Sequence, residues 1–568
     1  MPSTSFSSSS IIQGPKHPDL RPITIGQLAH IQAARYGSKD AIIVPWTKTR
    51  LSYLDLSHRS EIVSRGLLAM GVHKGTHVAV FSGDDERFIE LVFAVGRIGA
   101  VLVVLNKAYT VGECERALVH SGWMLFVGGG VVNRRSTAPL LRRLRGRLGC
   151  GLERIVLIRW DPGMVRLCGT WEDMLEEGAL VTMGTLLEAE GQVRSEDTVI
   201  LQFTSGTTGA PKAAMLSHFN IINNGRFIGA RLELTPDDVV CCPPPLFHCF
   251  GLVGGMLAAV THGSAVVFPH ADFDAAATVD ALVAERCTLL HGVPAMLTAV
   301  LHYVWQTKAP IRGIRTGIVA GSKVPPTLLV ELKKELGYRD IAITYGMTET
   351  SPASFMTKAS DTREQKLKTV GTLLPHVSAK IVDQHHHVLP RGDRGELCVS
   401  GYLLQQGYYR NPEKTREVMI HDKDGVLWMH TGDEAVIDEQ GYCHITGRIK
   451  DIIIRGGENI YPCEIEELLL SHPAVEQASV VGVPDDRYGE AVAAFLQARV
   501  GDSKPSLDEV KDWVGRDLSR HKIPSYIFWV GPGETIECFS ATGSGKIRKD
   551  MLREMGSKIL KPERKIKL

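Results

Sequence analysis

The feature that most constrains this chain is a repeated alternation of short β-branched runs with longer amphipathic ones. The short runs lie at 78–81, 102–105, 265–268, 288–292 and 317–320, and the amphipathic ones include 88–98 and 275–285. Buried parallel strands joined by crossover helices produce such an alternation. The sequence therefore predicts an α/β fold of layered sheets, and its 568 residues suffice for three or four packing units.

The pattern changes in the last third of the chain. Residues 379–407 alternate strand-like runs with Gly, Pro and Asp, which predicts a β-rich unit. A smaller α+β region is expected from residue 447, with a helix at 464–470, a strand at 478–483 and a helix near 507–518. We therefore expect a large N-terminal domain and a small C-terminal one.

The charge balance argues against several kinds of partner. Lys and Arg total 64 and Asp and Glu 63, so no global field is available to attract nucleic acid or an anionic membrane. The most apolar runs, 91–105 and 250–268, are interrupted by Arg97 and His262 and predict no transmembrane segment. Eleven cysteines without a CxxC pair predict reduced thiols in a reducing compartment.

The chain ends suggest a location. The Ser-rich start lacks an apolar stretch and is not a secretory signal, so we expect a cytoplasmic protein. Ile566-Lys567-Leu568 shares the basic–Leu ending of a peroxisomal address, with Ile where a small residue is usual.

A Gly/Thr-rich loop carries the first chemical signal. Between two β-like runs, 198–203 and 213–216, the chain reads Thr204-Ser205-Gly206-Thr207-Thr208-Gly209-Ala210-Pro211-Lys212. Glycines let successive amides face one anion, while the hydroxyls and the lysine add donors and charge, as a polyphosphate requires. The loop lacks the Gly-Lys-Ser/Thr of a Walker A motif. A plain hairpin turn would not need so many donor side chains.

This loop resembles the phosphate loop of the adenylate-forming enzymes, which include acyl-CoA synthetases, luciferases and peptide-synthetase adenylation domains. Six further motifs follow in that family's order: Pro245-Leu246-Phe247-His248, Tyr345-Gly346-Met347-Thr348-Glu349-Thr350, Gly395-Glu396-Leu397, Thr431-Gly432-Asp433, Gly447-Arg448-Ile449-Lys450-Asp451 and Ser544-Gly545-Lys546-Ile547. Within the family, the segment from Arg455 to Pro462 is most similar to medium-chain acyl-CoA synthetases. The resemblance spans about residues 23–552. It implies that ATP and CoA are co-substrates and that Mg²⁺ is a cofactor.

The resemblance implies a role for each motif. Thr204 and Glu349 would hold Mg²⁺, Tyr345 would stack on adenine, and Asp433 with Arg448 would bind the ribose. The full set of implied ATP-binding residues is Thr204, Ser205, Gly206, Thr207, Thr208, Gly209, Lys212, Tyr345, Gly346, Met347, Thr348, Asp433, Arg448 and Lys546. The ammonium of Lys546 would neutralise charge that builds between the acid and the α-phosphate.

The resemblance also implies a moving C-terminal domain. Lys450 matches the family's pivot between the adenylating and thioester-forming arrangements, so it is a candidate catalytic-cycle residue with Lys546, Glu349 and His248. The expected division is a disordered start at 1–22, an AMP-binding domain at 23–449, a mobile domain at 450–555 and a basic tail at 556–568.

The acyl pocket is expected to be apolar. In relatives the position of His248 gates the pocket, although a core histidine bonded to backbone is a competing interpretation. The other expected lining residues are Phe250, Gly251, Val293, Ala320, Gly321, Ser322, Thr344 and Met347, among which no acid is present to neutralise an amino-acid ammonium. A hydrophobic carboxylic acid is therefore the expected substrate.

Three functions stay open at this stage. The first is a CoA ligase, in which the Arg455-Gly456-Gly457 turn would let a pantetheine arm pass close to the backbone. The second is a fatty acyl-AMP ligase that loads a separate acyl carrier protein in a polyketide or lipopeptide pathway. The third is a catalytically silent nucleotide-binding scaffold.

One more motif invites a metal interpretation. His385, His386 and His387 are consecutive, so their side chains point in different directions, and the surrounding sequence offers no carboxylate–histidine framework. We expect a hairpin tip there rather than a metal site.

Overall fold

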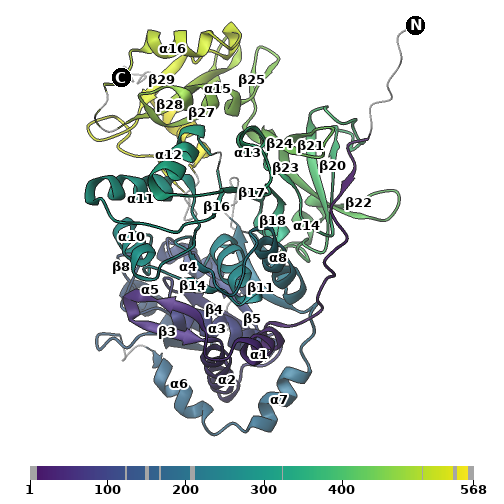
Figure 1. Cartoon of the computed structure of the whole chain (residues 1–568), viewed down its shortest axis with the longest axis vertical. Helices are drawn as coiled ribbons and strands as arrows, with labels where there is room; N and C mark the ends of the chain where they lie inside the picture. The colour runs from purple at the N-terminus through teal and green to yellow at the C-terminus, as the bar shows by residue number, and fades with distance from the viewer. Residues whose placement is uncertain are drawn as a thin grey trace, which may run out of the picture.

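The computed structural model describes residues 9–121, 124–146, 152–164, 168–204, 212–322, 324–499, 501, 503–541 and 547–560. The large N-terminal part fills the lower and right-hand regions of Figure 1, and the C-terminal part, in yellow-green and yellow, lies above it. The predicted mixed α/β architecture is confirmed. In the described part of the chain, no helix is long and apolar enough to cross a membrane.

Two mainly parallel sheets form the lower core. The first has the order β10-β9-β6-β4-β5-β11-β12 and is parallel except for the β11–β12 pair. The second has the order β15-β13-β14-β2-β3. The bounds of the first sheet are β4 His77–Phe81, β5 Val101–Val104, β6 Met124–Val127, β9 Arg154–Leu157, β10 Gly169–Thr170, β11 Thr198–Thr204 and β12 Lys212–Ser217; those of the second are β2 Asp40–Val44, β3 Thr49–Ser52, β13 Val239–Cys241, β14 Ala265–Val267 and β15 Leu289–Leu290.

Helices cover these sheets because the strands are apolar on both faces. All four residues of β5 and of β6 are buried, which is typical of parallel strands packed between helix layers. Arg97, at the end of the buried helix α3 (Glu86–Arg97), is 2% exposed and pairs with Glu190 at 2.5 Å. The other helices here are α1 Ile25–Tyr36, α2 Tyr53–Ala69, α4 Val111–Ser121, α5 Ala138–Arg145, α6 Trp171–Gly178, α7 Met183–Gly191, α8 His218–Arg231, α9 Ala258–His262, α10 Ala275–Ala284, α11 Pro294–Thr307 and α12 Pro326–Leu336.

Two further sheets complete the N-terminal part, and both are antiparallel except for the parallel β16–β17 pair. A four-stranded sheet has the order β16-β17-β18-β19, and the predicted β-rich unit has the order β1-β20-β21-β23-β22 with β24 paired to β23. Their bounds are β1 Ile12–Gln13, β16 Ile318–Ala320, β17 Ala342–Gly346, β18 Ala353–Met356, β19 Thr372–Leu373, β20 Val377–Val382, β21 Gly395–Gly401, β22 Met419–His421, β23 Leu427–Ile437 and β24 Cys443–Arg448; the helices α13 Arg363–Lys368 and α14 Pro412–Val418 accompany them.

The C-terminal part is one mixed sheet covered by helices, in the order β26-β25-β28-β27 with β29 on β28. Its elements are β25 Ile453–Arg455, β26 Glu458–Ile460, α15 Pro462–Ser471, β27 Val475–Asp485, β28 Gly489–Ala498, α16 Leu507–Gly515, β29 Tyr526–Trp529 and α17 Lys549–Leu560. The helices and strand predicted here from sequence are all present.

Both expected ends need correction. Residues 9–22 are not disordered, since β1 pairs antiparallel with β20 and the Ser10 hydroxyl donates to the Ile381 carbonyl. The basic tail does not start at 556, because α17 continues to Leu560 and buries Gly556 against Val483. Residues 561–568, with the Ile-Lys-Leu ending, lie outside the described residues.

Candidate active site

The predicted phosphate loop joins two antiparallel strands. Thr204, the last residue of β11, is the register partner of Lys212, the first residue of β12, and its hydroxyl lies 3.4 Å from the Lys212 carbonyl oxygen. Ser205, Gly206, Thr207, Thr208 and Gly209 lie outside the described residues. The two ends of the loop are therefore held together by the β11–β12 hairpin.

Tyr408 links the lysine of this loop to the predicted magnesium ligand. Its hydroxyl donates to Glu349 Oε1 at 2.7 Å, and its ring lies under the Lys212 ammonium, 5.2 Å from ring centroid to Nζ. The tyrosine is fixed because the backbone around it pairs with β12, through Tyr409 N to Ala213 O. Burial, followed by the Glu349 carboxylate, raises the pKa of Tyr408 well above its ordinary value, so it remains a neutral donor.

The predicted ribose residues are also brought together. Asp433 on β23 and Arg448 on β24 are register partners, with Arg448 Nε 3.1 Å from Asp433 Oδ1. The Tyr345 hydroxyl donates to Asp433 Oδ2 at 2.7 Å, although 88 residues separate the two. Each carboxylate oxygen keeps a second lone pair for a ribose hydroxyl.

Electrostatics fix the ionisation states of Arg448 and Tyr345. Burial works against the charge of Arg448, but the carboxylate of Asp433 and, more weakly, Glu349 hold the pKa of Arg448 above its ordinary value. Burial, then Asp433, raises the pKa of Tyr345. Arg448 is thus a fixed cation and Tyr345 a neutral donor at every physiological pH.

The turn after β17 carries Gly346, Met347, Thr348 and Glu349. A Cβ at Gly346 would lie 1.8 Å from the Pro352 carbonyl oxygen, so only glycine fits there. The short helix η4 (Thr348–Thr350) then places Glu349, 6% exposed, facing Tyr408. This close turn explains how one motif contributes to both the predicted ribose-binding and the predicted phosphate-binding residues.

His248 lies beside the same turn. Its Nδ1 accepts the Phe250 amide at 3.3 Å, and the neighbouring Cys249 Sγ lies 3.7 Å from Thr348 Oγ1. The following residues form a π-helix, η3 (Phe250–Leu257). A Cβ at Gly251 would lie 2.4 Å from two proline carbonyl oxygens, so this glycine permits the close packing of the π-helix.

The other expected acyl-pocket residues form neighbouring pairs. Gly321, at φ +93°, faces Val293, whose Cγ1 would lie 3.1 Å from an added Cβ. Ala320 and Thr344 are register partners on β16 and β17. The Thr344 hydroxyl is buried and has no hydrogen-bond partner among the described residues. Ser322 is exposed, and Met347 is partly buried against the core.

Besides Tyr408, three residues that support the site were not predicted. His291 stacks on Phe250 with ring centroids 6.1 Å apart, and Gln202 on β11 donates to the Phe247 carbonyl oxygen. Asp84 accepts the Leu246 amide at 2.7 Å, and burial raises the pKa of Asp84 to about 7 despite the nearby Lys107. Asp84 follows β4 at the carboxyl end of a parallel sheet, where sites often gather, so a sequence signal for it existed.

The predicted CoA turn has a simple backbone explanation. Gly456 and Gly457, at φ +61° and +87°, make the two-residue turn between β25 and β26, which requires the left-handed region at both positions. The Arg455 guanidinium lies over the Tyr488 ring at 4.7 Å and donates to the His521 carbonyl.

Of the predicted hinge Lys450 and the predicted catalytic Lys546, only the first lies within the described residues. Lys450 lies in η5 (Ile449–Asp451), directly between β24 of the N-terminal part and β25 of the C-terminal part. Lys546 lies outside the described residues, but the chain on either side of its loop is paired, through an Ala541–Ile547 bridge and the Arg548 amide donating to Ser540 O.

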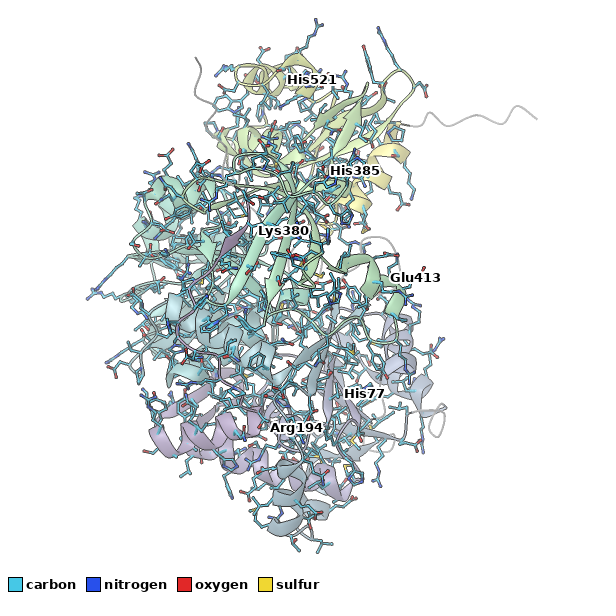
Figure 2. The ribbon with its side chains drawn as sticks, turned by 90° about the vertical axis from the view of Figure 1, so that its right-hand side faces the viewer. His77, Arg194, Lys380, His385, Glu413 and His521 are labelled. Atoms are coloured by element: carbon cyan, nitrogen blue, oxygen red, sulfur yellow. The ribbon has the colours of Figure 1, made fainter. Side chains whose placement is uncertain are left out.

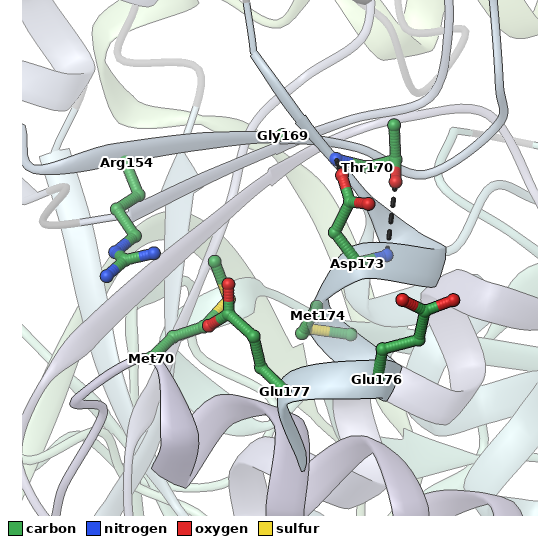
Figure 3. A pocket seen from close by; sticks show the side chains of 8 residues that line it. All are labelled: Met70, Arg154, Gly169, Thr170, Asp173, Met174, Glu176 and Glu177. Carbon is green, nitrogen blue, oxygen red and sulfur yellow. Dashed lines mark hydrogen bonds between the residues drawn. The ribbon is translucent and has the colours of Figure 1, made fainter. Parts of the chain in front are cut away.

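A separate surface hollow, drawn in Figure 3, lies between α6 and the β9–β10 edge. Its side chains include Met70, Arg154, Asp173 and Glu177, and none of the predicted site residues lines it. It is therefore distinct from the candidate active site.

Comparison with known proteins identifies the family. Residues 30–409 match the AMP-binding enzyme family and residues 464–546 match the AMP-binding enzyme C-terminal domain. The chain belongs to the AMP-binding enzyme family.

Named relatives cover nearly its full length. The acyl-CoA ligase sidI of Aspergillus fumigatus is 47% identical over 97% of this chain and 94% of its own. The mitochondrial medium-chain acyl-CoA ligase ACSF2 of Bos taurus is 35% identical over 96% of this chain and 89% of its own. Among solved structures, ATP-bound MatB from Rhodopseudomonas palustris is similar with a TM-score of 0.78, 27% identity and coverage of 95% of this chain and 100% of its own.

Proposed function

We propose that this acyl-CoA ligase activates a medium-length or modified aliphatic carboxylic acid with ATP and transfers the acyl group to CoA. One observation carries the adenylation half of the proposal: Tyr345, Asp433 and Arg448 form a bonded trio beside the Glu349–Tyr408–Lys212 array. The first group fits a ribose, and the second provides a cation and a carboxylate for a polyphosphate.

The reaction would proceed in two displacements. An oxygen of the acid's carboxylate attacks the α-phosphorus of ATP, the bond to the β-phosphate oxygen breaks, and pyrophosphate leaves. The thiol of CoA then loses its proton and attacks the acyl carbon, the acyl–oxygen bond breaks, and AMP leaves with the oxygen that came from the acid. Arg448 and Lys212 supply fixed positive charge for the first displacement, in which negative charge grows on the phosphates.

Glu349 and Thr204 would hold Mg²⁺. The carboxylate of Glu349 is buried, Tyr408 binds only one of its oxygens, and carboxylate and hydroxyl oxygens are the ligands that Mg²⁺ prefers. When bound, the ion supplies positive charge to the phosphates.

Lys546 and Lys450 would act in sequence. Lys546 would bridge the acid and the α-phosphate during adenylation, and rotation about Lys450 would then remove it so that pantetheine, entering past Arg455, Gly456 and Gly457, can reach the acyl carbon. Among the described residues, the charged pairs that this rotation would break include Arg394–Glu464 at 3.2 Å, Arg499–Glu331 at 3.3 Å and His302–Glu476 at 3.8 Å. Ion pairs as exposed as these are weak.

The pocket composition supports an aliphatic acid. Phe250, Val293, Ala320 and Gly321 offer apolar or small surfaces, and an α-ammonium there would remain unpaired at a cost of several kcal/mol. The spare hydroxyl of Thr344 leaves room for one polar group on the chain, which is why modified acids are included.

A panel of acids tests the proposal. Pyrophosphate release is measured with and without CoA for octanoate, 3-hydroxyoctanoate and 2-aminooctanoate, which share one chain length. We expect turnover with one or both of the first two, little with the third, and strong stimulation by CoA. A preference for the amino acid would refute the pocket assignment. Turnover that CoA does not stimulate would instead favour loading of a carrier protein, and no turnover with any acid would favour a silent scaffold.

A further inference from the structure

A cluster of metal-ligand side chains lies on the β-rich unit, on the green strands at the right of Figure 1. Glu396 and Cys398 are two residues apart on β21, so they share a face, and Cys398 is the register partner of His430 on β23. His430 Nδ1 lies 2.7 Å from Glu396 Oε2 and 3.5 Å from Cys398 Sγ. Carboxylate, thiol and imidazole thus converge within 4.8 Å of one another.

The histidine run at the β20–β21 turn adds a second imidazole. Asp383 Oδ1 accepts the amides of His385 and His387, which confirms the predicted hairpin tip. His386, at φ +64°, packs on His430 with ring centroids 4.6 Å apart. The expectation that no carboxylate–histidine framework surrounds these histidines is therefore wrong, because Glu396 and His430 arrive from strands remote in sequence.

One role of this arrangement is to support the loop that carries Gly432 and Asp433, here called the ribose loop, but that role explains only part of it. Glu396 Oε1 accepts the amide of Gly432, next to Asp433, at 3.0 Å, so the His430–Glu396 pair helps to fix that loop. Packing against Val382 and Trp428 explains why Cys398 is fully buried, but it does not explain why the sulfur faces the same imidazole nitrogen. A thiol is a weak hydrogen-bond partner but a strong metal ligand.

The neighbouring cation is occupied elsewhere. Lys380 on β20, labelled in Figure 2 below His385, is the register partner of Cys398 on β21. Its ammonium lies 4.1 Å from the Trp428 ring centroid and 3.7 Å from Asp422. Because Lys380 interacts with these two partners, it does not neutralise Glu396. The Glu396 carboxylate can therefore bind a metal cation.

We propose that Glu396, Cys398 and His430 form a binding site for a divalent transition-metal ion, of which Zn²⁺ fits best, with His386 as the fourth ligand. Sulfur, nitrogen and oxygen ligands in a tetrahedral set are those of zinc sites. Ligand bonds of about 2.0–2.3 Å require ligand atoms roughly 3.3–3.8 Å apart, so the His430–Glu396 contact opens by about 0.6 Å or more. On binding, the Cys398 thiol releases its proton to solvent and the His430 proton moves from Nδ1 to Nε2.

The proposed metal site shares Glu396 with the loop that carries Asp433. Binding at Glu396 Oε2 leaves Oε1 on the Gly432 amide, so the metal and the ribose loop share one carboxylate. A metal ion bound at this site should therefore change the KM for ATP and leave the preference among carboxylic acids unchanged.

Cobalt provides the direct test. The purified full chain is stripped with a chelator, exchanged into metal-free buffer and titrated with Co²⁺, whose bond to a thiolate gives an intense near-ultraviolet charge-transfer band. We expect one Co²⁺ per chain with that band, and its loss when Zn²⁺ is added. A folded wild-type chain that shows no stoichiometric band would overturn the proposal.

Matched variants locate the ligands. Cys398→Ser should abolish the band, whereas Cys538→Ser, at an exposed thiol elsewhere, should retain it. His386→Ala should weaken Co²⁺ affinity about tenfold or more, whereas His385→Ala, on the same exposed turn, should not. These turn variants do not disturb the core, so they remain informative if Cys398→Ser fails to fold. Equal affinity in all variants would refute the assignment.

Discussion

Tyr408 is the residue whose role depends most on the folded geometry, and Tyr408→Phe isolates its hydroxyl. The variant deletes the 2.7 Å hydrogen bond to Glu349 but keeps the ring under Lys212. A hydrogen bond to a charged group contributes about 1.5–3 kcal/mol. At 1.4 kcal/mol per tenfold, kcat/KM for ATP should fall roughly ten- to a hundredfold.

Two further effects separate positioning from packing. If Tyr408 orients Glu349 toward Mg²⁺, the Mg²⁺ concentration for half-maximal activity should rise in Tyr408→Phe. Tyr408→Ala also removes the aromatic surface under Lys212, worth about 0.5–1 kcal/mol, so it should lose a further two- to fivefold. Because Glu349 is buried, the free energy of unfolding should also fall by about 1–2 kcal/mol in Tyr408→Phe.

The assay is initial-rate pyrophosphate release over a matrix of ATP and Mg²⁺ concentrations, with thermal unfolding of each variant recorded in parallel. Tyr409→Phe is the matched control, since the neighbouring ring packs on His77 at 4.8 Å, away from Glu349. If Tyr408→Phe and Tyr409→Phe share the wild-type kcat/KM and Mg²⁺ dependence, the positioning argument fails.

Three further predictions concern other parts of the cycle. The pKa of Asp84 is raised by burial to about 7, so its folded state favours the protonated form, and the stability it contributes below about pH 4 is lost as pH rises toward 7. Asp84→Asn should therefore gain stability relative to wild type between pH 4 and 8, and a pH-independent difference in unfolding free energy would contradict the burial argument. Lys546→Ala should slow adenylation about 10²–10³-fold and spare thioester formation from supplied acyl-AMP, and equal loss of both steps would exclude its assigned role. Lys450→Pro, in a folded protein, should retain acyl-AMP formation and lose CoA transfer, because proline fixes φ near roughly −65°; unchanged CoA transfer would place the hinge elsewhere.

The fold was predictable where local pattern and tertiary packing agree. Strands such as β5 and β6 are apolar throughout because helices cover both faces, and that burial leaves a direct mark on the sequence. The π-helix η3 leaves no such mark. It depends on Gly251 packing against proline carbonyls, which is a tertiary contact.

The candidate site divides in the same way. Asp433 and Arg448 belong to motifs that follow one another in the family's order, so the sequence was enough to identify them as site residues. The Tyr345–Asp433 bond joins residues 88 positions apart, and no periodicity encodes it. Tyr408 was missed because its partner Glu349 lies on another element, and Cys398 and His430 because only strand register brings them together.

Isotope transfer from the acid to AMP tests the central claim most directly. The acid is labelled with ¹⁸O in both carboxylate oxygens and turned over with ATP and CoA, and the AMP and pyrophosphate are analysed by mass spectrometry. If the acid attacks the α-phosphorus and the thiol then displaces AMP, each AMP carries one ¹⁸O and pyrophosphate carries none. Formation of ADP with label in inorganic phosphate, or unlabelled AMP, would contradict an acyl-adenylate intermediate.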